Sequence, residues 1–531
     1  MRSLEPTSRT PPPRGVVRGA VALGLAVAAL VTAVGSGTSE ASRAAPSSTS
    51  SSGVNAGLAN AATSPEVHDW PTYGHDPQHT FSGLTRLTPR SARTLRLAWK
   101  FPTGDAVTAT PTVVNRTVYV GSWDGYFYAL ALASGALRWK FKLDPQPAVV
   151  PVPGKPRPAN SDGGLVTSSA WFEPAGPGHP PLVIFGGGFT LYALVAHTGR
   201  LFWKDEYTGR PDLPPDPVHD GTRIFSSPVV TGGKVLFGVS VDGAHGYRGY
   251  IAAADLLTGA PVWEYQTDTD VTGSVLNDGC GNVWSSGSLV PGIGAVVFDT
   301  SDCESSNQLP LSESILALST SDGHLLWSMK PQRVDPGCDY DFGATVNVGL
   351  DGSGAATFLG VGGKDGTYYS LDPASGALRW STNVVFGGQS GGFIGTTAYD
   401  GSHVVGSTAL GDFGGPLCDP SNPRDQSFQE PTAHGFDVGT GSVLWQGTGV
   451  PSFAPTTVSN GMAFSGVALS PMVVVRDVAN GNVLVKLAVK VPSWSGIATV
   501  GNALVLGTGT SYEGSGAGVL VFTPRGRPPL R

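Results

Sequence analysis

The sequence predicts an all-β protein, an eight-bladed β-propeller, and three observations carry this prediction. The 531 residues include 74 glycines and 43 prolines and only 14 % are charged, a composition that suits short strands joined by tight turns. A strand–turn–strand unit recurs along the chain. The two ends of the chain hold complementary fragments of one further unit. Together these features indicate a closed ring of repeated sheets.

The recurring unit ends in a large apolar residue, and a glycine stands four positions before it. The seven copies are YALALASGALRW (128–139), YALVAHTGRLFW (192–203), AAADLLTGAPVW (252–263), LALSTSDGHLLW (316–327), YSLDPASGALRW (369–380), HGFDVGTGSVLW (434–445) and VVRDVANGNVLV (474–485). Each copy reads as a strand, a turn that needs glycine at positive φ, and a second strand. A further hairpin precedes most copies, as in 110–125. Four antiparallel strands that repeat every roughly 40–65 residues are typical of propeller blades.

The chain ends supply the eighth blade. LRLAWKF (95–101) is a lone outer strand that contains Trp99, whereas 497–509 and 518–524 supply inner strands without a final tryptophan strand. Pairing the first strand with the last blade closes the ring and removes exposed sheet edges. We expect Trp99 and the tryptophans of the repeat to pack between blades.

Some tryptophans, among them three at or near the entries to blades, fall outside the register of the repeat. Trp284 lies in DGCGNVWSSG (278–287), at the entry to a blade, and Trp171 and Trp494 are also off the repeat position. Entry strands line the channel of a propeller, and the loops that precede them shape one of its faces. Aromatic side chains there are candidates for a binding site.

The N-terminal region predicts export. Residues 1–45 carry several arginines and then an apolar run over 20–34, which is short for a membrane span and suits a signal peptide, with an uncleaved signal anchor as the alternative. Residues 46–67 are an Ala/Ser-rich stretch that we expect to be a disordered linker. Residues 68–531 form a single propeller domain in this interpretation. The protein is then secreted or associated with the cell envelope, without a membrane span beyond the possible N-terminal anchor.

Four cysteines follow the apolar run. Outside the cell an even number of cysteines suggests disulfides, and of the three pairings we prefer Cys280–Cys303 with Cys338–Cys418 because these residues are nearest in sequence. CxxC and CxxCH motifs are absent from the sequence, which argues against a zinc site and against covalently bound haem. The net charge of −7 and the lack of a basic stripe with interleaved aromatics argue against a nucleic-acid partner.

These features resemble the quinoprotein dehydrogenases, whose cofactor is pyrroloquinoline quinone (PQQ). The lead-in DWPTYGHDPQHTFSGLTRLTPRSARTLRLAWKF (69–101) is similar to the N-terminal segment of that family, and the Gly-x-x-x-Trp ending is similar to its tryptophan-docking repeat. The resemblance covers nearly everything after residue 68. Related propellers that act in outer-membrane protein assembly keep the repeat without PQQ, so the cofactor has to be judged from the site residues.

The resemblance implies a pocket for a flat tricarboxylate and for Ca²⁺, which prefers oxygen ligands. Trp284 matches the floor tryptophan of the family. Eighteen residues later Asp302 stands where the family has a metal-binding asparagine, and an aspartate keeps a hard oxygen ligand. Thr167 and Ser168 supply hydroxyls where the family binds a cofactor carboxylate. Trp494 is a further aromatic candidate for cofactor binding.

The resemblance also implies catalytic residues. VDPGCDYDFGA (334–344) is similar to the loop that carries the catalytic aspartate; Asp339 is the first choice for the base, Asp335 the second and Asp341 the third. Lys364 matches the family cation that contacts a quinone oxygen. The implied mechanism is that the aspartate removes the alcohol proton while hydride passes to the quinone, polarised by Ca²⁺ and the lysine.

Two departures from the family pattern stand against this interpretation. The usual metal-binding glutamate is missing from VSVDGAHGYRGYIA (239–252), so that Asp242 or His245 would have to replace it. The adjacent cysteine pair of methanol-oxidising members is also missing, although other members lack it too.

The sequence therefore leaves three hypotheses. The first is a PQQ- and Ca²⁺-dependent alcohol dehydrogenase that oxidises a small-molecule or polymeric alcohol and passes electrons to a separate acceptor. The second is a non-catalytic binding or assembly scaffold that has lost the cofactor. The third is a propeller that binds a glycan or another polymer through its open channel face. The missing glutamate favours the second hypothesis, whereas Trp284, Lys364 and the aspartates of 334–344 favour the first.

Overall fold

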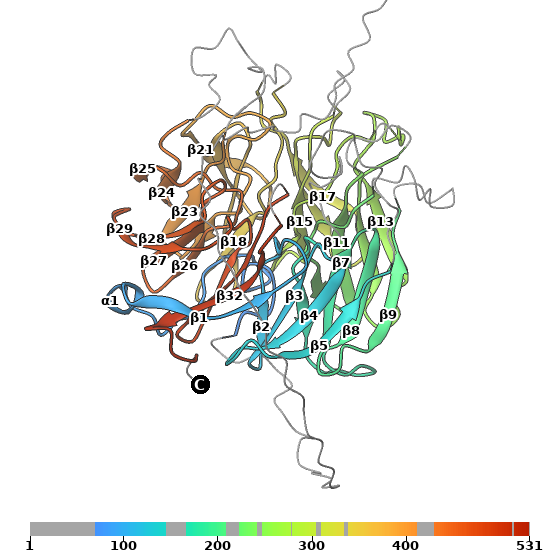
Figure 1. Cartoon of the computed structure of the whole chain (residues 1–531). Coiled ribbons are helices and arrows are strands. Elements are labelled where there is room, and N and C mark those ends of the chain that lie inside the picture. The colour runs from blue at the N-terminus through green and yellow to red at the C-terminus, as the bar shows by residue number, and fades with distance from the viewer. Residues whose placement is uncertain are drawn as a thin grey trace, which may run out of the picture.

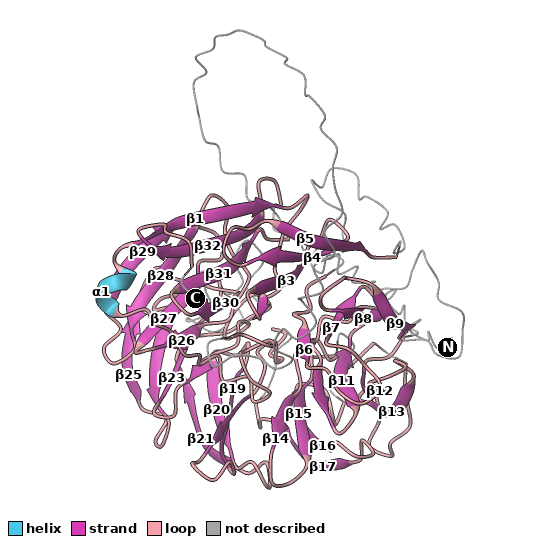
Figure 2. Ribbon diagram, turned by 90° about the horizontal axis from the view of Figure 1, so that it is seen from below, coloured by secondary structure: helices cyan, strands magenta, loops and turns pink. Residues whose placement is uncertain are grey.

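The computed structural model describes residues 69–144, 166–208, 222–241, 247–277, 279–303, 309–333, 338–410, 429–511 and 514–529. Within them, eight four-stranded antiparallel sheets stand around a common centre (Figures 1 and 2). This confirms the predicted eight-bladed propeller. The predicted signal segment and linker, residues 1–45 and 46–67, lie outside the described residues. Over the described ranges, no helix is long and apolar enough to cross a membrane.

Each blade is a meander that runs outward from the channel, and the last blade takes its outer strand from the N-terminal region. Blades 1 to 4 are β2 (Thr112–Val114), β3 (Thr117–Gly121), β4 (Tyr126–Ala131) and β5 (Leu137–Lys142); β6 (Trp171–Glu173), β7 (Leu182–Gly187), β8 (Thr190–Val195) and β9 (Leu201–Glu206); β10 (Val229–Thr231), β11 (Lys234–Val239), β12 (Tyr250–Asp255) and β13 (Pro261–Gln266); and β14 (Ser288–Val290), β15 (Ala295–Asp299), β16 (Ile315–Ser319) and β17 (Leu325–Met329). Blades 5 to 8 are β18 (Asn347–Leu350), β19 (Ala356–Gly362), β20 (Thr367–Leu371) and β21 (Leu378–Asn383); β22 (Ala398–Tyr399), β23 (His403–Ser407), β24 (Ala433–Asp437) and β25 (Val443–Gly447); β26 (Thr457–Ser459), β27 (Met462–Gly466), β28 (Met472–Asp477) and β29 (Val483–Ala488); and β30 (Ile497–Val500), β31 (Ala503–Thr508) and β32 (Gly518–Pro524) with β1 (Leu95–Pro102). One short helix, α1 (Pro89–Ala92), precedes β1 in the described chain.

The ring closes as the sequence predicts. Strand β1 pairs antiparallel with β32, from Leu95 opposite Pro524 to Pro102 opposite Gly518. The order of this sheet is β1-β32-β31-β30, so the first strand of the chain completes the last blade. The unpaired edges that an open ring would present at its two ends are thereby removed.

The repeated tryptophan and glycine meet across blade junctions. Each repeat glycine lies against the indole of the preceding blade, so that a Cβ on Gly135 or Gly376 would come within 2.6 Å of Trp99 and 2.4 Å of Trp327. These glycines have φ near +70°, so the turn and the contact both require glycine. In six of the seven, the indole N–H donates to a backbone carbonyl of the next blade, as from Trp99 to Leu132 O at 2.8 Å; that of Trp263 is buried without a partner among the described residues. The docking role predicted for these tryptophans is confirmed.

Hydroxyl groups join the blades closer to the centre. At five consecutive junctions, the backbone N–H of a residue at the entry to one blade donates to the hydroxyl of the corresponding residue in the next, with N–O distances of 2.9–3.0 Å. The six residues are Thr110, Ser169, Ser227, Ser286, Thr345 and Thr396, and all are buried. These bonds satisfy backbone donors that have no water to bond, and they align the start of one blade with the next.

The lead-in segment, residues 69–87, runs along the inner strands. Its backbone carbonyls accept N–H groups from the innermost strands of several blades, among them Leu289 of β14, Val348 of β18 and Tyr399 of β22. Trp70 pairs with Val113 of β2, and the segment reaches the turn after β30 through Arg86 N and Gly501 O. The first residues of the propeller therefore contact blades on all sides of the channel.

Candidate functional site

The candidate residues gather at one end of the ring because of the strand directions. Trp284 stands shortly before β14 and Asp341 shortly before β18, whereas Asp302 follows β15 and Lys364 follows β19. The strands of a blade are antiparallel, so the start of its first strand and the end of its second lie at the same end. Loops of blades 4 and 5 that are distant in sequence are thus brought to one face of the channel.

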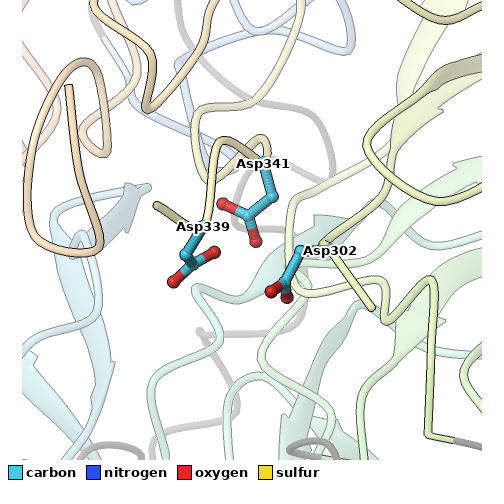
Figure 3. A group of neighbouring side chains, drawn as sticks. All are labelled: Asp302, Asp339 and Asp341. Carbon is cyan, nitrogen blue, oxygen red and sulfur yellow. The ribbon is translucent and has the colours of Figure 1, made fainter. Parts of the chain in front are cut away.

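Three aspartates form a compact cluster on this face. One carboxylate oxygen from each of Asp302, Asp339 and Asp341 lies within 4.8 Å of the others. Figure 3 shows the three side chains pointing toward one another. We call these residues the aspartate cluster. Asp341 has an almost fully buried side chain, 2 % exposed, whereas that of Asp339 is 23 % exposed.

Lys364 lies between the two aspartates of the blade 5 entry. Its Nζ is 3.0 Å from both carboxylate oxygens of Asp339 and 2.7 Å from Oδ1 of Asp341. The same Nζ lies 5.3 Å from the centre of the Trp284 ring. A Cβ on Gly343 would come within 2.3 Å of that indole, so the glycine lets the loop lie on the ring. The structure therefore brings together five residues that the sequence singled out.

Burial and charge shift the titration of this group. The pKa of Asp339 lies well above its usual value because of burial, which the ammonium of Lys364 only partly offsets. Burial likewise raises the pKa of Asp341. Burial alone would lower the pKa of Lys364, but the neighbouring carboxylates outweigh it and the pKa is raised. The lysine is charged at neutral pH, and the three carboxylates exceed it by two negative charges when all are ionised.

A disulfide links the two blade 4 loops of the site. Cys280 and Cys303 are bonded, as predicted, and they adjoin the segments that carry Trp284 and Asp302. The N–H of Gly281 also donates to the carbonyl of Asp302 at 3.1 Å. Cys338 is disulfide-bonded too. Its expected partner, Cys418, lies outside the described residues.

Sequence reasoning missed a second charged network beside the aspartate cluster. Nη1 of Arg333 lies 3.4 Å from Asp365 and 3.2 Å from the hydroxyl of Tyr369, and its Nη2 lies 4.0 Å from Glu313. Nη2 also donates to the backbone carbonyl of Tyr340, between Asp339 and Asp341. The sequence carries no signal for this network: the comparison of VGGKDGTYYSL (361–371) with VGSWDGYFYAL (120–130) distinguishes Lys364 only, because the aspartate is common to both and Arg333 lies outside them.

The remaining predicted site residues belong to the entry segments of blades 2 and 8 or lie outside the described residues. The hydroxyl of Ser168 is buried and accepts the N–H of Gly186 at 3.1 Å, a bond within its own blade. Thr167 is partly exposed at the entry to blade 2. Trp494, at the entry to blade 8, donates its N–H to Ala468 O at 3.0 Å and meets Phe453 edge-on at 4.8 Å. Asp242, His245 and Asp335 lie outside the described residues.

Comparisons with known proteins agree with this architecture. A family model described as glucose/ethanol/alcohol dehydrogenase, beta-propeller domain, matches residues 70–385, and one described as outer membrane protein assembly factor BamB matches residues 312–518. The structure aligns with a europium-containing methanol dehydrogenase at a TM-score of 0.64 and 18 % identity, over 86 % of this chain and 98 % of the other. It aligns with BamB from Moraxella catarrhalis at 0.53 and 15 % identity, over 81 % and 99 %. These structures show the fold.

Among curated proteins, the chain is 24 % identical to the polyvinylalcohol dehydrogenase of Sphingopyxis sp. over 392 residues. That alignment covers 67 % of this chain and 55 % of the relative, so the chain spans about half the length of the curated relatives it matches. The match to the dehydrogenase propeller model extends over more than half of the 531 residues. With its eight blades and seven docking tryptophans, the chain belongs to the glucose/ethanol/alcohol dehydrogenase β-propeller family, that of the PQQ quinoprotein dehydrogenases.

Proposed function

We propose that this propeller is a PQQ- and Ca²⁺-dependent oxidoreductase that oxidises an alcohol and passes the electrons to a separate acceptor. The observation that carries the proposal is the position of Lys364, whose ammonium lies 5.3 Å over the Trp284 ring and contacts two carboxylates of the aspartate cluster. An aromatic floor, a cation and a set of hard oxygen ligands are the parts that a quinone with a bound metal needs.

The donor set of the aspartate cluster fits a hard cation. Three carboxylates and one ammonium leave an excess of two negative charges, which Ca²⁺ would neutralise. Asp302, Asp339 and Asp341 would hold the ion, each with an oxygen already within 4.8 Å of the others. Side-chain oxygens from other loops or water would complete the six to eight ligands that Ca²⁺ usually takes.

The surroundings of Trp284 fit a flat cofactor. The indole is only partly buried, and on one side it is supported by the loop at Gly343. Thr167, with a partly exposed side chain, is the better of the two predicted hydroxyls for a cofactor carboxylate, since the hydroxyl of Ser168 is used within its blade. Trp494 is retained as an aromatic candidate on blade 8.

PQQ, when bound, supplies a quinone that accepts a hydride equivalent and a proton, two electrons in all. The residues of this chain would hold the alcohol and remove its hydroxyl proton. Asp339 is our first candidate for this base, because its carboxylate is the more exposed of the two that contact Lys364 and its pKa is raised. Asp341 is the alternative, and Lys364 would donate to the oxygen on which negative charge develops.

The substrate is proposed at the level of an alcohol, small or polymeric. Relatives named polyvinylalcohol dehydrogenase support the polymeric class. The sequence has no CxxCH motif for covalent haem, so a separate acceptor would take the electrons. Export by residues 1–45 would place the reaction in the cell envelope or outside the cell.

The test is a titration of the purified protein with PQQ in the presence of Ca²⁺, followed by quinone absorbance and then by dye reduction with short alcohols and polyvinyl alcohol. Trp284→Ala should weaken PQQ binding, while Asp339→Asn should abolish turnover with binding largely retained. Asp322→Asn, in an exposed turn of blade 4, is the matched control and should leave both unchanged. If Asp341→Asn alone abolishes turnover, the base is Asp341.

A non-catalytic binding or assembly scaffold is the second candidate. The match of residues 312–518 to the BamB model favours it. Absence of saturable PQQ binding by the wild-type protein would reject the dehydrogenase proposal and leave the scaffold.

A further inference from the structure

Arg333 holds the backbone between the two carboxylates that contact Lys364. Its Nη2 donates to the carbonyl of Tyr340, the residue between Asp339 and Asp341. The guanidinium carbon lies 5.5 Å from the centre of the Phe342 ring and 6.0 Å from that of Tyr340. The side chain is only 13 % exposed, so these contacts form in a site largely closed to water, where charge-assisted bonds are strong.

Arg333 also connects this loop to the blade 5 hairpin. Its Nη1 lies 3.4 Å from Asp365 and 3.2 Å from the hydroxyl of Tyr369. In the opposite direction, Lys364 of the hairpin reaches Asp341 at 2.7 Å and donates its backbone N–H to the carbonyl of that residue at 2.9 Å. Each segment therefore contributes a cation that binds an anion of the other, and together the pairs fix the segments relative to one another.

The hairpin itself does not need an arginine. In blade 1, Asp124 occupies the place of Asp365 and accepts the Tyr128 hydroxyl at 2.7 Å, as Asp365 accepts that of Tyr369. From the neighbouring segment, Asp124 accepts the backbone N–H of Gly104, at 2.7 Å. A neutral donor from the neighbouring segment is enough for the fold of this hairpin, so the arginine of blade 5 serves something specific to that blade.

The charges around Arg333 balance, unlike those of the aspartate cluster. Arg333 and Lys330 stand against Glu313 and Asp365, two positive and two negative charges, and Nζ of Lys330 bonds Leu309 O at 2.9 Å beside them. This network adds no net charge to the site. It can support the aspartate cluster without competing for a bound cation.

We infer that Arg333 is a positioning residue, which acts through the carbonyl of Tyr340 to hold Asp339 and Asp341 in the geometry that receives the cation. The part of this inference that concerns the cation rests on the proposed function. The part that concerns the placement of the loop does not.

The experiment compares Arg333→Gln and Arg333→Lys with Arg476→Gln in the full-length protein. Arg476 is a matched control, a buried arginine of blade 7 that donates to the carbonyls of Gly481 and Thr448 at 2.9 Å and has no contact with the aspartate cluster. The measurements are Ca²⁺ binding by calorimetry, Tb³⁺ luminescence, the melting temperature, and hydrogen exchange of the backbone amides of 338–346.

Arg333→Gln should weaken Ca²⁺ and Tb³⁺ binding by about 10- to 100-fold, the usual effect of losing a residue that orients metal ligands. It should also speed hydrogen exchange in 338–346. Arg333→Lys should recover part of both effects, because an ammonium can reach one of the acceptors but not all of them. Arg476→Gln should lower the melting temperature without either change. In the Asp339→Asn background, Arg333→Gln should have a smaller effect on binding than in the wild type.

Unchanged hydrogen exchange in 338–346 in Arg333→Gln would overturn the inference, as would the same change in Arg476→Gln. Where the wild type binds either ion, equal binding by Arg333→Gln would also overturn it. If the wild type binds neither ion while exchange in 338–346 responds to Arg333→Gln alone, the positioning role is supported and the proposed metal-dependent function fails.

Discussion

Blades 1 and 5 contain the same hairpin with different chemistry. Residues 120–130 and 361–371 share the pattern V-G-x-x-D-G-x-x-Y-x-L, and in both the aspartate accepts an N–H two residues later, at 3.1 Å in blade 1 and 3.0 Å in blade 5. In both, the residue before this aspartate donates its backbone N–H to the blade's entry segment: Trp123 to Ala106 and Lys364 to Asp341, each at 2.9 Å.

The side chains at two positions separate the hairpins. Where blade 5 has Lys364 facing Asp341, blade 1 has Trp123 facing Ala106. The indole N–H of Trp123 bonds the hydroxyl of Thr108 at 3.0 Å, a neutral contact. The repeat thus supplies a backbone that tolerates either pair of side chains, and the charged pair at these positions of blade 5 is part of the candidate site. Variants made at equivalent positions can test this division between scaffold and site.

The largest difference in unfolding free energy between equivalent variants of the two blades should be between Lys364→Met and Trp123→Met. Removing the ammonium leaves buried carboxylates without their partner, which costs about 3–5 kcal/mol of unfolding free energy, and turnover should be lost. Ca²⁺ should restore part of the stability, because it supplies the missing positive charge. Urea unfolding with and without Ca²⁺ measures both effects. Trp123→Met, at the matching position, should lose less unfolding free energy, and Ca²⁺ should restore none of it. Equal losses and equal responses to Ca²⁺ in the two variants would contradict the division between scaffold and site.

Asp365→Asn should cost more than Asp124→Asn. Asp365 loses the ion pair with Arg333, for which we expect about 2–3 kcal/mol, less than a fully buried pair. The carboxylate of Asp124 accepts hydrogen bonds from neutral donors, so we expect Asp124→Asn to lower the free energy of unfolding by about 1 kcal/mol. Denaturant midpoints of the two variants check the ranking. Equal losses would show that the ion pair of Arg333 adds nothing beyond what the hairpin already has.

The docking glycines should behave alike in the two blades. Gly135→Ala and Gly376→Ala both place a Cβ at positive φ, which should cost about 1–2 kcal/mol of stability. Both also crowd a tryptophan, which should cost roughly 1 kcal/mol more. Gly461→Ala separates the two causes, because its φ is +72° and a Cβ there meets nothing within 4 Å. In thermal melts of the three variants, Gly461→Ala should have the highest melting temperature. A clear difference between Gly135→Ala and Gly376→Ala would show that the scaffold is not equivalent in the two blades.

Acid should weaken the ring through histidines outside both hairpins. Burial lowers the pKa of His79 to about 4 and that of His434 to about 3, each from 6.5. The unfolded chain then binds more protons below pH 6.5, so stability is full above that pH and falls as pH drops toward 4. We expect a loss of about 1 kcal/mol per histidine between about pH 7 and about pH 5.5. His434→Gln should reduce the slope of stability against pH, measured by urea unfolding; an unchanged slope would reject this origin.

The repeat made much of the fold predictable, because its spacing sets strand, turn and docking contact at once. The blade count, the closure of β1 on β32 and the Cys280–Cys303 bond are confirmed. The gathering of Trp284 and Lys364 also followed, since the start of the first strand of a blade and the end of the second strand lie at the same end of the ring. The catalytic and binding roles assigned to these residues stay predictions.

What the sequence did not reveal depends on contacts between distant segments. The bond of Arg333 to the Tyr340 carbonyl has no signature in residue type, because any nearby cation could have made it. Ser168 looks like a ligand group in the sequence, yet its buried hydroxyl accepts the N–H of Gly186. This bond depends on how the entry segment and β7 of blade 2 align. The path of residues 69–87 was equally hidden, since its bonds are made by backbone atoms.

The path of the lead-in segment has a mechanical consequence. Strand β1 closes the ring at the rim by pairing with β32 within blade 8, while residues 69–87, just upstream, attach from within the channel to blades on both sides of that pairing. Opening the ring at its chain ends would therefore require two sets of bonds to break, one at the largest radius and one at the smallest. The contact between the two ends of the chain is thus held by two separate sets of bonds, and local opening under load should start at a blade boundary elsewhere in the ring.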